Sequence, residues 1–356
     1  MGDRPTVCSP LPKAASGGCT VQSALRHQKK SRRKKAWHLT LVSLLSLVLI
    51  GAGAGGVGAY KLSRSFDDQV ATIDQVFPPA SLRPAPSTGV AAEARNILVL
   101  GSDSRGVHNA SISDLTGQRS DVIMVVHIPA DHEGVWVMSI MRDSWVEIPG
   151  RGQSKINAAL SWGGVPLAVQ TVESLIKTRI DHVAVIDFEG FQAITDALGG
   201  VEIDNPVEFE SSKIKGHTFA VGKQVVTGTE ALAYSRERYA FADGDFTRVR
   251  NQQRFFKAML STVMSSRTVT NPATVVDLIT AVTPWIAVDD GLDFALLAGL
   301  ELQLRDLQGS DLTFFTLPTS GTGISDDGQS FVHVDRGALA PLQQAFQTDT
   351  LADYRP

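Results

Sequence analysis

The chain has 356 residues and 43% hydrophobic content, enough for one large domain or two ordinary ones with a sizeable buried core. Its net charge of −4 is unevenly distributed, because residues 1–35 carry nine lysines and arginines and one acid, whereas the remainder carries 24 basic and 36 acidic residues. Only Cys8 and Cys19 occur, and both lie in the basic segment. A disulfide within the rest of the chain is therefore excluded, and that part must be held together by its core.

An uncharged apolar run, residues 36–60, follows the basic segment. It is long enough to cross a bilayer as a helix, for which about 20 apolar residues are needed. By the positive-inside rule, residues 1–35 form a cytoplasmic leader and the large C-terminal part lies outside. The sequence thus predicts a single-pass protein of the cell membrane with an extracytoplasmic domain. A cleaved signal peptide is the alternative, since Ala52-Gly53-Ala54 could pass for a cleavage site.

Residues 61–92 contain four prolines in a context of small residues, and we interpret them as an extracytoplasmic stalk. Strand-like and helical patterns then alternate through residues 93–350, which predicts a layered α/β domain. Strands are expected at 96–100, 122–128, 135–140, 182–187, 201–203, 312–316 and 331–334. Helices are expected at 158–162, 166–177, 189–198, 230–233, from 247 onward, and at 271–282, 292–304 and 338–346.

Charged residues stand at the ends of the first three expected strands. Asp103 follows the first strand, where ligands of α/β sheets gather, and Asp121 begins the second, on the same face as Arg119. Arg142 and Asp143 follow the third strand. Magnesium takes one or two protein carboxylates and completes its shell with water and substrate phosphate, so Asp103 and Asp121 are candidate Mg²⁺ ligands. The alternative is that Asp103 caps a turn and Asp121 pairs with Arg119.

The densest group of charges is residues 235–255, which carry five arginines and no lysine. In a strand, Arg236 and Arg238 would leave the same face together with Leu232 and Tyr234. The helical reading around residue 232 competes with this strand reading. Asp245 is expected to cap the helix that follows.

From Thr247 onward, a helix places Arg248, Gln252 and Phe255 on one side and Arg250 and Arg254 on the other. Arginine presents a planar fork of donors that matches phosphate oxygens in pairs, which lysine lacks. The converging arginines 236, 238 and 248 therefore predict a site for a di- or polyphosphate. The alternative is a surface salt-bridge network with the acids at 237, 243 and 245.

Other common site signatures are missing from the sequence. No HExxH or CxxC motif marks a zinc site, and no GxSxG motif marks a serine hydrolase. Residues 216–223 (GHTFAVGK) are one residue too long for a P-loop, and Gln224 stands where a serine or threonine is required. The phosphate chemistry therefore rests on the arginines and aspartates.

Assembled in this order, these residues make the chain similar to the LytR-CpsA-Psr family of bacterial envelope proteins. The motifs that carry the resemblance, in family order from residue 96 to 255, are NILVLGSDSR, RSDVIMVVHI, SIMRDSW, KINAAL, DFEGF, DALGGVEI and DGDFTRVRNQQR. The resemblance continues less sharply to about residue 347. It implies an αβα fold with a central mixed sheet. It also implies a phosphotransferase that moves a glycopolymer from a polyprenyl-pyrophosphate carrier to peptidoglycan, forming a phosphodiester and releasing polyprenyl phosphate.

The resemblance also assigns roles to residues of this chain. The implied catalytic residues are Asp103, Arg119, Asp121 and Arg142, with Asp103 and Asp121 linked to Mg²⁺. The residues implied to bind the pyrophosphate are Arg119, Arg142, Arg236, Arg238, Arg248 and Gln252. The lipid tail is expected in an apolar tunnel whose lining the sequence does not identify, and the base for the acceptor hydroxyl is left open between Asp103 and Asp143.

Three other functions stay open at this point. A membrane-bound transcriptional regulator would use the basic leader to bind DNA, but the arginines would then lie across the membrane from any chromosome, so no nucleic-acid partner is expected. A non-catalytic protein that binds the lipid carrier would need the arginines and the tunnel but neither aspartate. A pyrophosphatase would give the phosphate to water. The transferred polymer is open among teichoic acid, arabinogalactan and capsule.

Overall fold

The computed structural model describes residues 63–64, 66, 70–102, 117, 120–263, 280–281 and 283–355, apart from the side chain of residue 301. The predicted leader and the predicted membrane span at 36–60 lie outside the described residues. The same is true of Asp103, of Arg119 and of most of the helix expected at 271–282. No helix within the described ranges has both the length and the hydropathy of a membrane span.

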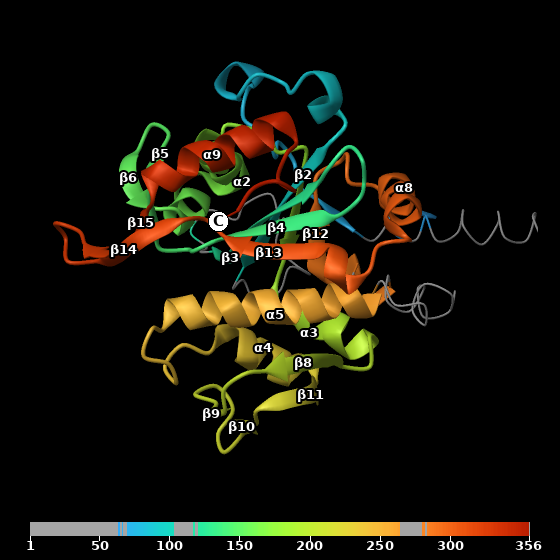
Figure 1. Ribbon diagram of the computed structural model, residues 1–356, viewed down its shortest axis with the longest axis vertical. Helices are drawn as coiled ribbons and strands as arrows, with labels where there is room; N and C mark the ends of the chain where they lie inside the picture. Colours follow the sequence, from blue (N-terminus) through green and yellow to red (C-terminus); the bar gives the residue numbers. More distant parts are fainter. Residues whose placement is uncertain are drawn as a thin grey trace, which may run out of the picture. The chain divides into compact units, whose positions relative to one another are not determined.

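A seven-stranded mixed sheet forms the centre of the domain, in the order β1-β12-β7-β2-β3-β4-β13 (Figure 1). Its strands are β1 (Ala71–Thr72), β2 (Arg95–Ser102), β3 (Ser120–Ile128), β4 (Val135–Ile140), β7 (His182–Ile186), β12 (Ile286–Val288) and β13 (Leu312–Thr316). Antiparallel pairing joins β2 to β3 and β3 to β4, whereas β7 runs parallel to β2 and β13 parallel to β4. The predicted mixed sheet is confirmed.

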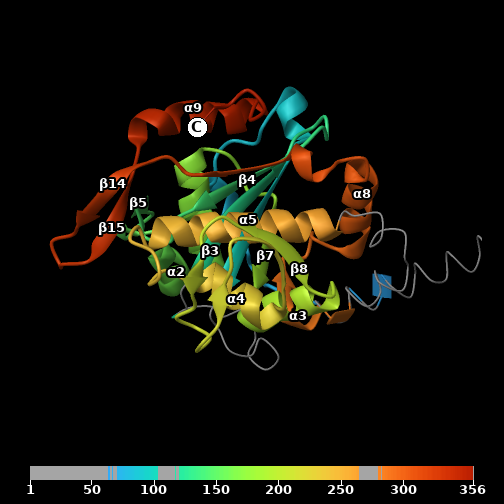
Figure 2. The same cartoon turned by 60° about the horizontal axis from the view of Figure 1, so that its bottom comes forward.

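Helices cover both faces of this sheet (Figures 1 and 2). They are α2 (Asn157–Ile176) and α9 (Arg336–Thr348) on one face, and α5 (Asp245–Val263) and α8 (Phe294–Leu304) on the other. Successive side chains of β2 point to opposite faces of the sheet. Leu98 and Leu100 pack in the core with α2 and α9, and Ile97 and Val99 pack on the face covered by α5 and α8. The αβα layering expected from the sequence is therefore present.

A smaller lobe lies beyond α5 on the side away from the sheet (Figure 1). It consists of α3 (Phe188–Ala197), α4 (Gly228–Arg236), β8 (Val201–Asn205), β9 (Phe209–Glu210), β10 (Thr218–Phe219) and β11 (Gly222–Val226). Its own core includes Phe219, Tyr234 and Phe255, all fully buried. Because Phe255 belongs to α5, this helix is shared between the lobe and the sheet.

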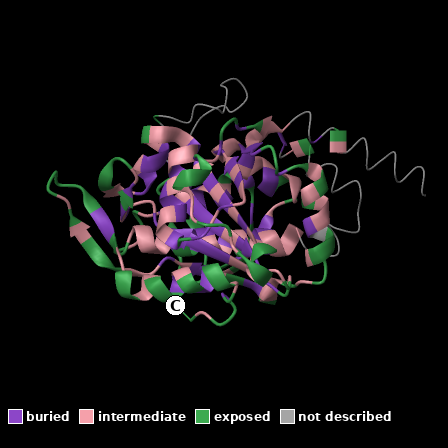
Figure 3. Cartoon of the chain, turned by 90° about the horizontal axis from the view of Figure 1, so that it is seen from above, coloured by how far each residue is buried: buried purple, intermediate pink, exposed green. Residues whose placement is uncertain are grey.

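A second, four-stranded sheet has the order β14-β15-β5-β6. Its strands are β5 (Ser144–Ile148), β6 (Gly152–Lys155), β14 (Thr319–Ile324) and β15 (Ser330–Val334). Of these, the sequence predicted only β15. The β14–β15 hairpin projects from the body of the domain, and most of it is exposed, whereas buried residues concentrate in the central sheet (Figure 3). The short 3₁₀ helices are Ala80–Leu82, Gly89–Ala92, Thr283–Trp285 and Gly309–Asp311.

Helix α2 joins the two helices expected at 158–162 and 166–177. Gly163 and Gly164 adopt non-helical angles inside it, and Gly164 has a φ of 62° with a ψ of −160°, a conformation essentially restricted to glycine. Pro166 follows this kink, where its missing N–H removes no regular hydrogen bond. The kink turns the first turns of α2, which carry Asn157 and Ser161, away from the remainder of the helix.

The segment expected to be a stalk is part of the domain from residue 70 onward. Ile73 and Val76 are buried in the core under α2, and β1 pairs in parallel with β12. Arg83 forms a buried ion pair with Glu173 of α2. The domain therefore begins before the predicted boundary at residue 93. The prolines suggested an extended stalk, but the apolar side chains between them pack against the domain core.

Candidate active site

The site begins where β3 starts and β4 ends. In this antiparallel pair Ile123 lies opposite Ile140, and the same register continued outward sets Asp121 against Arg142. A guanidinium N–H of Arg142 donates to Asp121 Oδ1. Strand pairing alone thus joins two residues that stand far apart in the sequence.

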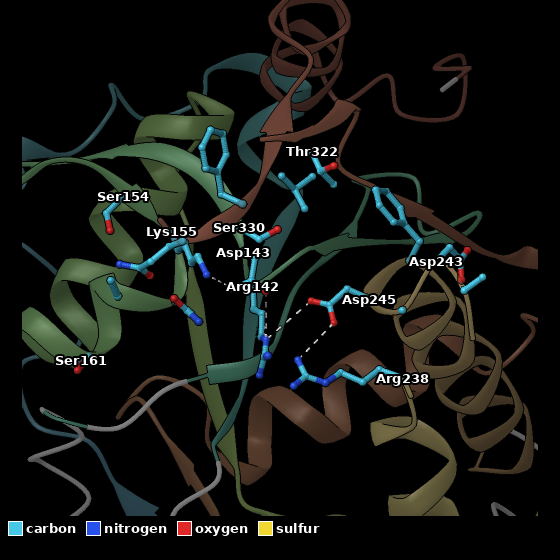
Figure 4. Close-up of a pocket in the computed structure, with 18 of the residues that line it drawn as sticks. Arg142, Asp143, Ser154, Lys155, Ser161, Arg238, Asp243, Asp245, Thr322 and Ser330 are labelled. Atoms are coloured by element: carbon cyan, nitrogen blue, oxygen red, sulfur yellow. Dashed lines mark ion pairs between the residues drawn. The ribbon is translucent and has the colours of Figure 1, made fainter. Parts of the chain in front are cut away.

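The first turn of α5 completes the cluster from the opposite side (Figure 4). Asp245 Oδ2 accepts a hydrogen bond from Arg248 Nη2 at 3.1 Å, and it lies 4.0 Å from Arg142 Nε. Asp245 Oδ1 is 3.9 Å from Arg238 Nη1. The sequence predicted that Asp245 caps α5, but Asp245 is the first residue of this helix. Gly244, which precedes it, has a φ of 49°, a left-handed conformation that glycine adopts easily.

Asp143 links this cluster to the second sheet. Its carboxylate lies 3.6 Å from Arg142 Nε and 3.5 Å from Lys155 Nζ, which ends β6. Burial acts to raise the pKa of Asp143, but a hydrogen bond with Asp245 and the nearby cations outweigh it, so its pKa lies below the usual range. Burial and the proximity of Asp143 raise the pKa of Asp245.

Two arginines in the cluster keep a buried donor without an acceptor. The side chain of Arg248 is 6% exposed, and burial lowers the pKa of its guanidinium. Neither Arg248 Nε nor Arg142 Nε has a hydrogen-bond partner. Buried donors are nearly always satisfied in folded proteins, so these two indicate an acceptor that comes from a ligand.

Of the two readings that the sequence leaves open around Leu232, the structure contains the helix, so Arg236 and Arg238 do not share one strand face. Helix α4 extends to Arg236, because Thr227 and Glu230 form a capping box at its start and Tyr234 packs in the core of the smaller lobe. Arg236 stacks on the ring of Phe188 at 4.2 Å and pairs with no carboxylate in the described part of the chain. Arg238 lies two residues beyond the helix and reaches Asp245 instead.

The turn between α4 and α5 is held by Glu237. Its carboxylate is fully buried and accepts hydrogen bonds from the backbone N–H groups of Ser212, Arg238 and Tyr239. Burial acts to raise the pKa of Glu237, but these hydrogen bonds outweigh it and hold the pKa below its usual range. The residue is therefore a backbone anchor for Arg238 rather than a member of a surface salt-bridge network.

The predicted phase of α5 is confirmed for Arg248, Gln252 and Phe255, which are buried, and for Arg250, which has a 48% exposed side chain and pairs with Asp243 at 2.5 Å. Arg254, predicted on the same side as Arg250, is instead half-buried and donates to Asn251 Oδ1 at 2.9 Å. Gln252 Nε2 donates to the carbonyl of Ser235 at 3.1 Å, which ties α5 to the end of α4. The side of α5 that meets the rest of the site therefore carries Arg248 and Gln252.

Two recesses of opposite character meet at this cluster. A narrow one of about 50 Å³ lies between the sheet and helices α3, α4 and α5, and its lining is almost entirely apolar. Asp121, Arg236 and Gln252 are among the few polar residues that line it. The other is an open groove of about 780 Å³, lined by Arg142, Asp143, Lys155, Arg238 and Asp245 and by residues of α2 and of the β14–β15 hairpin. The Asp121–Arg142 ion pair stands between the two.

Of the predicted site residues, the structure brings together Asp121, Arg142, Arg236, Arg238, Arg248 and Gln252, while Asp103 and Arg119 lie outside the described residues. Sequence reasoning missed Lys155 as a partner of Asp143, Asp245 as the carboxylate between three arginines, and Phe188 as the support of Arg236. The Thr227–Glu230 capping box was the available signal that α4 continues towards Arg236.

Within the described ranges, no three His, Cys, Asp or Glu side chains gather so that they could hold a metal ion. Asp121 is one carboxylate at the edge of the apolar recess, and it is paired with Arg142, which lines the groove. A single such carboxylate suits Mg²⁺, which keeps most of its shell for water and phosphate, better than Zn²⁺ or Ca²⁺.

In this αβα fold, an apolar recess and a polar groove meet at a cluster of arginines and carboxylates. The chain belongs to the LytR_cpsA_psr family, whose model matches residues 65–348. One relative is the polyisoprenyl-teichoic acid–peptidoglycan teichoic acid transferase TagU of Bacillus mycoides (strain KBAB4), 35% identical over 234 residues, which cover 64% of this chain and 71% of the relative.

The protein of the same name from Enterococcus faecalis (strain ATCC 700802 / V583) is 29% identical over 315 residues, covering 88% of this chain and 97% of the relative. Among solved structures, TagT bound to LI-WTA has a TM-score of 0.59 at 22% identity, over 78% of this chain and 98% of that chain. This structural likeness establishes the fold, and the family model establishes the membership.

Proposed function

We propose that the protein is a phosphotransferase that moves a glycopolymer from a polyprenyl-pyrophosphate carrier to peptidoglycan. The observation that carries the proposal is the position of the arginine cluster, with two unfilled buried N–H donors, at the junction of an apolar recess and a polar groove. A lipid-linked glycopolymer has the same three parts in the same order: an apolar chain, a pyrophosphate and a saccharide. The names of the two TagU relatives describe transferases of this kind.

In this proposal the described cations divide between the two phosphates. Arg236 and Gln252, which border the apolar recess, bind the phosphate on the lipid side. Arg142 and Arg238 line the groove and bind the phosphate on the sugar side. Arg248, which approaches the same carboxylate of Asp245, supplies a third guanidinium. Phosphoryl transfer depends mostly on positioning and on neutralising charge, which fixed guanidinium groups supply. We also retain Arg119, which lies outside the described residues, as a proposed pyrophosphate-binding residue.

Mg²⁺ is the proposed cofactor, with Asp121 and Asp103 as the residues that would hold it. When bound, the metal would neutralise charge on the pyrophosphate oxygens. Asp121 is paired with Arg142, so a metal held there would compete with this guanidinium for the carboxylate. Calorimetric titration of the full-length protein with Mg²⁺ and a non-hydrolysable pyrophosphate analogue, repeated on Asp121→Asn, tests the metal site without turnover.

Asp143 is our candidate for the base that receives the proton of the acceptor hydroxyl. Its carboxylate lines the groove, on the side from which an acceptor could enter. The neighbouring Lys155 and Arg142 orient this carboxylate, and Asp103 is the other candidate.

The lipid chain needs more space than the apolar recess now offers. Its walls include Phe191, Phe256 and Met259, side chains that can change rotamer. We propose that they move aside when the polyprenyl chain enters. We further propose a single-pass membrane protein with a cytoplasmic leader, supported by the basic run and the apolar run at 36–60.

The full chain in nanodiscs, incubated with a polyprenyl-pyrophosphate-linked saccharide and peptidoglycan oligomers, provides the test. We expect a phosphodiester-linked product and free polyprenyl phosphate, and at least a hundredfold slower transfer by Arg248→Ala. Release of phosphorylated saccharide into water with no adduct would identify a pyrophosphatase. Tight binding without any turnover would identify a carrier protein. Either result would overturn the proposal.

A further inference from the structure

Helix α8 is apolar around most of its circumference. From Phe294 to Leu300 it contains no polar side chain. Leu296, Leu300 and Leu304 pack in a cluster with residues of α5 and of the central sheet. A helix that is apolar on all sides is ordinarily covered on all sides, by protein or by lipid. The outward side of α8 therefore calls for a partner.

This outward side is exposed in the structure. Ala295, Ala298 and Leu302 share it at helical spacing, with Leu297 on its flank. Leu302 is 62% exposed and Leu297 is 36% exposed. At Gly299, which completes the surface, an added Cβ would meet no neighbouring atom within 4 Å. We call the surface made by these five residues the α8 face.

The α8 face lies close to the point where the chain enters the domain. Phe66 is buried, and its ring packs on that of Phe294 with the centroids 6.2 Å apart. The proposed membrane span ends at residue 60, so only residues 61–66 lead from it to Phe66. An extended chain of that length reaches at most about 20 Å. In the proposed topology, α8 therefore begins close to the bilayer surface.

The length and the charges of α8 suit a helix that lies on a bilayer. It has 11 residues, about half of the roughly 20 that a crossing helix needs. Interfacial helices sink their apolar side about 5–10 Å into the boundary between head groups and acyl chains. Exposed charges of both signs stand at its ends, Asp293 before it and Arg305 and Asp306 after it. The contact is therefore expected to be apolar and to depend little on salt.

The inner side of α8 continues into the apolar recess of the site. Phe256 of α5 lines this recess and also packs in the cluster that contains Leu300. Leu260, about one turn further along α5, packs in the same cluster. Helix α5 begins at the arginine cluster, and its far end lies beside α8 (Figures 1 and 2). In the proposed function a polyprenyl chain passes from the bilayer into this recess, and α8 stands at that end of it.

The α8 face is too small for a stable contact with a second copy of the chain. A helix of 11 residues is about 16 Å long and 10 Å wide, so one side covers roughly 160 Å². A stable protein interface buries about 800 Å² on each partner. A bilayer needs no such area, because the proposed span already keeps the domain at the membrane.

We propose that the α8 face contacts the membrane bilayer and holds the α8 end of the apolar recess against the lipid. The inference rests on the proposed function and on the proposed membrane span. It adds the surface by which the domain meets the bilayer, with Leu297 and Leu302 as the side chains that enter the lipid.

The first test places a nitroxide spin label on the full chain in nanodiscs, after replacement of Cys8 and Cys19 by serine. The label is attached at Leu302→Cys or, as a control, at Ile324→Cys. Ile324 is 76% exposed and belongs to the β14–β15 hairpin, at the opposite end of the domain from α8 (Figures 1 and 2). We expect oxygen, which concentrates in the bilayer, to reach the label at 302 more readily than a water-soluble nickel chelate does. The order should be reversed at 324, and high salt should change neither result.

The second test measures transfer by the double variant Leu297→Asp/Leu302→Asp. Its KM for a polyprenyl-pyrophosphate-linked donor embedded in the nanodisc should rise about tenfold or more, because charged side chains oppose insertion of the α8 face. Its KM for a short-chain, water-soluble donor should stay unchanged. The matched control is Val221→Asp/Val225→Asp in the smaller lobe, where the two valines are 64% and 63% exposed. Both KM values should stay unchanged in this control, and melting temperatures confirm that each variant is folded.

The outcomes separate this inference from the proposed function. If the label at 302 lies in lipid but the parent protein transfers nothing, the α8 assignment stands and the proposed function fails. A label at 302 that the nickel chelate reaches more readily than oxygen overturns the inference. So does a label that neither reagent reaches, which would mean that protein covers the face, and so does spin–spin broadening from a second copy. An unchanged KM of the double variant for the embedded donor would overturn the link to the recess.

Discussion

Arg83 and Arg248 each pair with a carboxylate inside the protein, and they differ in what remains unpaired. Arg83 Nε and Nη2 donate to Glu173 Oε1 at 2.9 and 2.6 Å, and Nη2 also reaches the carbonyl of Ile180 at 2.5 Å. The Ile180 N–H donates to the same carboxylate. Arg248, by contrast, has one hydrogen bond to Asp245, and its buried Nε has none.

The difference separates a structural ion pair from a binding site. The charge of Arg83 is balanced by Glu173, and its donors have acceptors within the protein, so a ligand would gain no new hydrogen bond there. Around Arg248, burial and the nearby Arg142 lower the pKa of the guanidinium, although Asp245, Asp121 and Asp143 act in the opposite direction. The buried Nε still lacks an acceptor, which an oxygen of a bound pyrophosphate would supply.

The largest effect on stability is expected from removing the ion pair between Arg83 and Glu173. Glu173→Ala leaves the guanidinium of Arg83 and the N–H of Ile180 without their acceptor, which should destabilise the protein by about 3–5 kcal/mol. The melting temperature should fall by roughly 10 °C. Transfer activity per folded molecule should not change. Glu173→Gln, which retains an acceptor for Ile180, should lose clearly less, and an equal loss would mean that charge rather than hydrogen bonding dominates here.

The next effect concerns the site. Arg236→Ala removes a charge-assisted contact to the lipid-side phosphate worth about 1.5–3 kcal/mol, so polyprenyl-pyrophosphate binding should weaken roughly tenfold to 150-fold. Stability should change little, because Arg236 pairs with no carboxylate in the described residues. Arg236→Lys should restore binding only in part. Calorimetry on the purified full-length protein measures both quantities, and full rescue by lysine would remove the paired-donor argument.

A third prediction concerns Asp349, another buried carboxylate whose hydrogen bonds are structural. It accepts hydrogen bonds from the His127 ring at 2.9 Å and from the Ala130 N–H at 3.0 Å. Burial acts to raise the pKa of Asp349, but these hydrogen bonds hold it below its usual range. The resulting stability is present above the unfolded-state pKa of about 3.9 and is lost as the pH falls through the lower folded-state value.

Asp349→Asn should therefore cost about 1–2 kcal/mol at pH 5. The gap in melting temperature between the variant and the parent should close as the pH is lowered from 4 towards 2. A gap that persists unchanged at pH 2 would show that the interaction does not depend on the charge of Asp349.

The smallest effect is expected at the exposed pair of Arg250 and Asp243. Exposed ion pairs contribute about 0–1 kcal/mol because water and salt screen them. Arg250→Ala should therefore leave the melting temperature and the transfer rate nearly unchanged, in contrast to Arg248→Ala. Comparable damage from the two substitutions would contradict the assignment of the two sides of α5.

Much of this architecture follows from local patterns. The apolar runs at 96–100, 122–128 and 135–140 correspond to β2, β3 and β4, and the run at 312–316 to β13, because buried strands concentrate aliphatic residues. The phase of α5 follows from the 3.6-residue period alone. Family motifs supplied the site residues, and those that the structure describes gather at the two recesses.

What could not be predicted depends on contacts distant in sequence. Strand β5 is short, strands β6 and β14 consist mostly of polar residues and glycine, and all three depend on pairing with one another or with β15. Lys155 meets Asp143 only because the β5–β6 hairpin folds back on itself. The period-two pattern of Leu232 to Arg238 is real, but burial of Tyr234 between helices decides in favour of α4.

The order of the central sheet also bears on how the chain assembles. Strand β4 pairs on its outer side with β13, which is formed by residues 312–316 near the end of the chain. Strand β1 pairs with β12, with Ala71 opposite Ala287. Pairings across such long stretches of chain form slowly, because loop closure precedes the gain from contact. Until the last third arrives, the edge of β4 is open to other strands. A chain truncated before residue 312 should thus accumulate as aggregate rather than as a smaller folded domain.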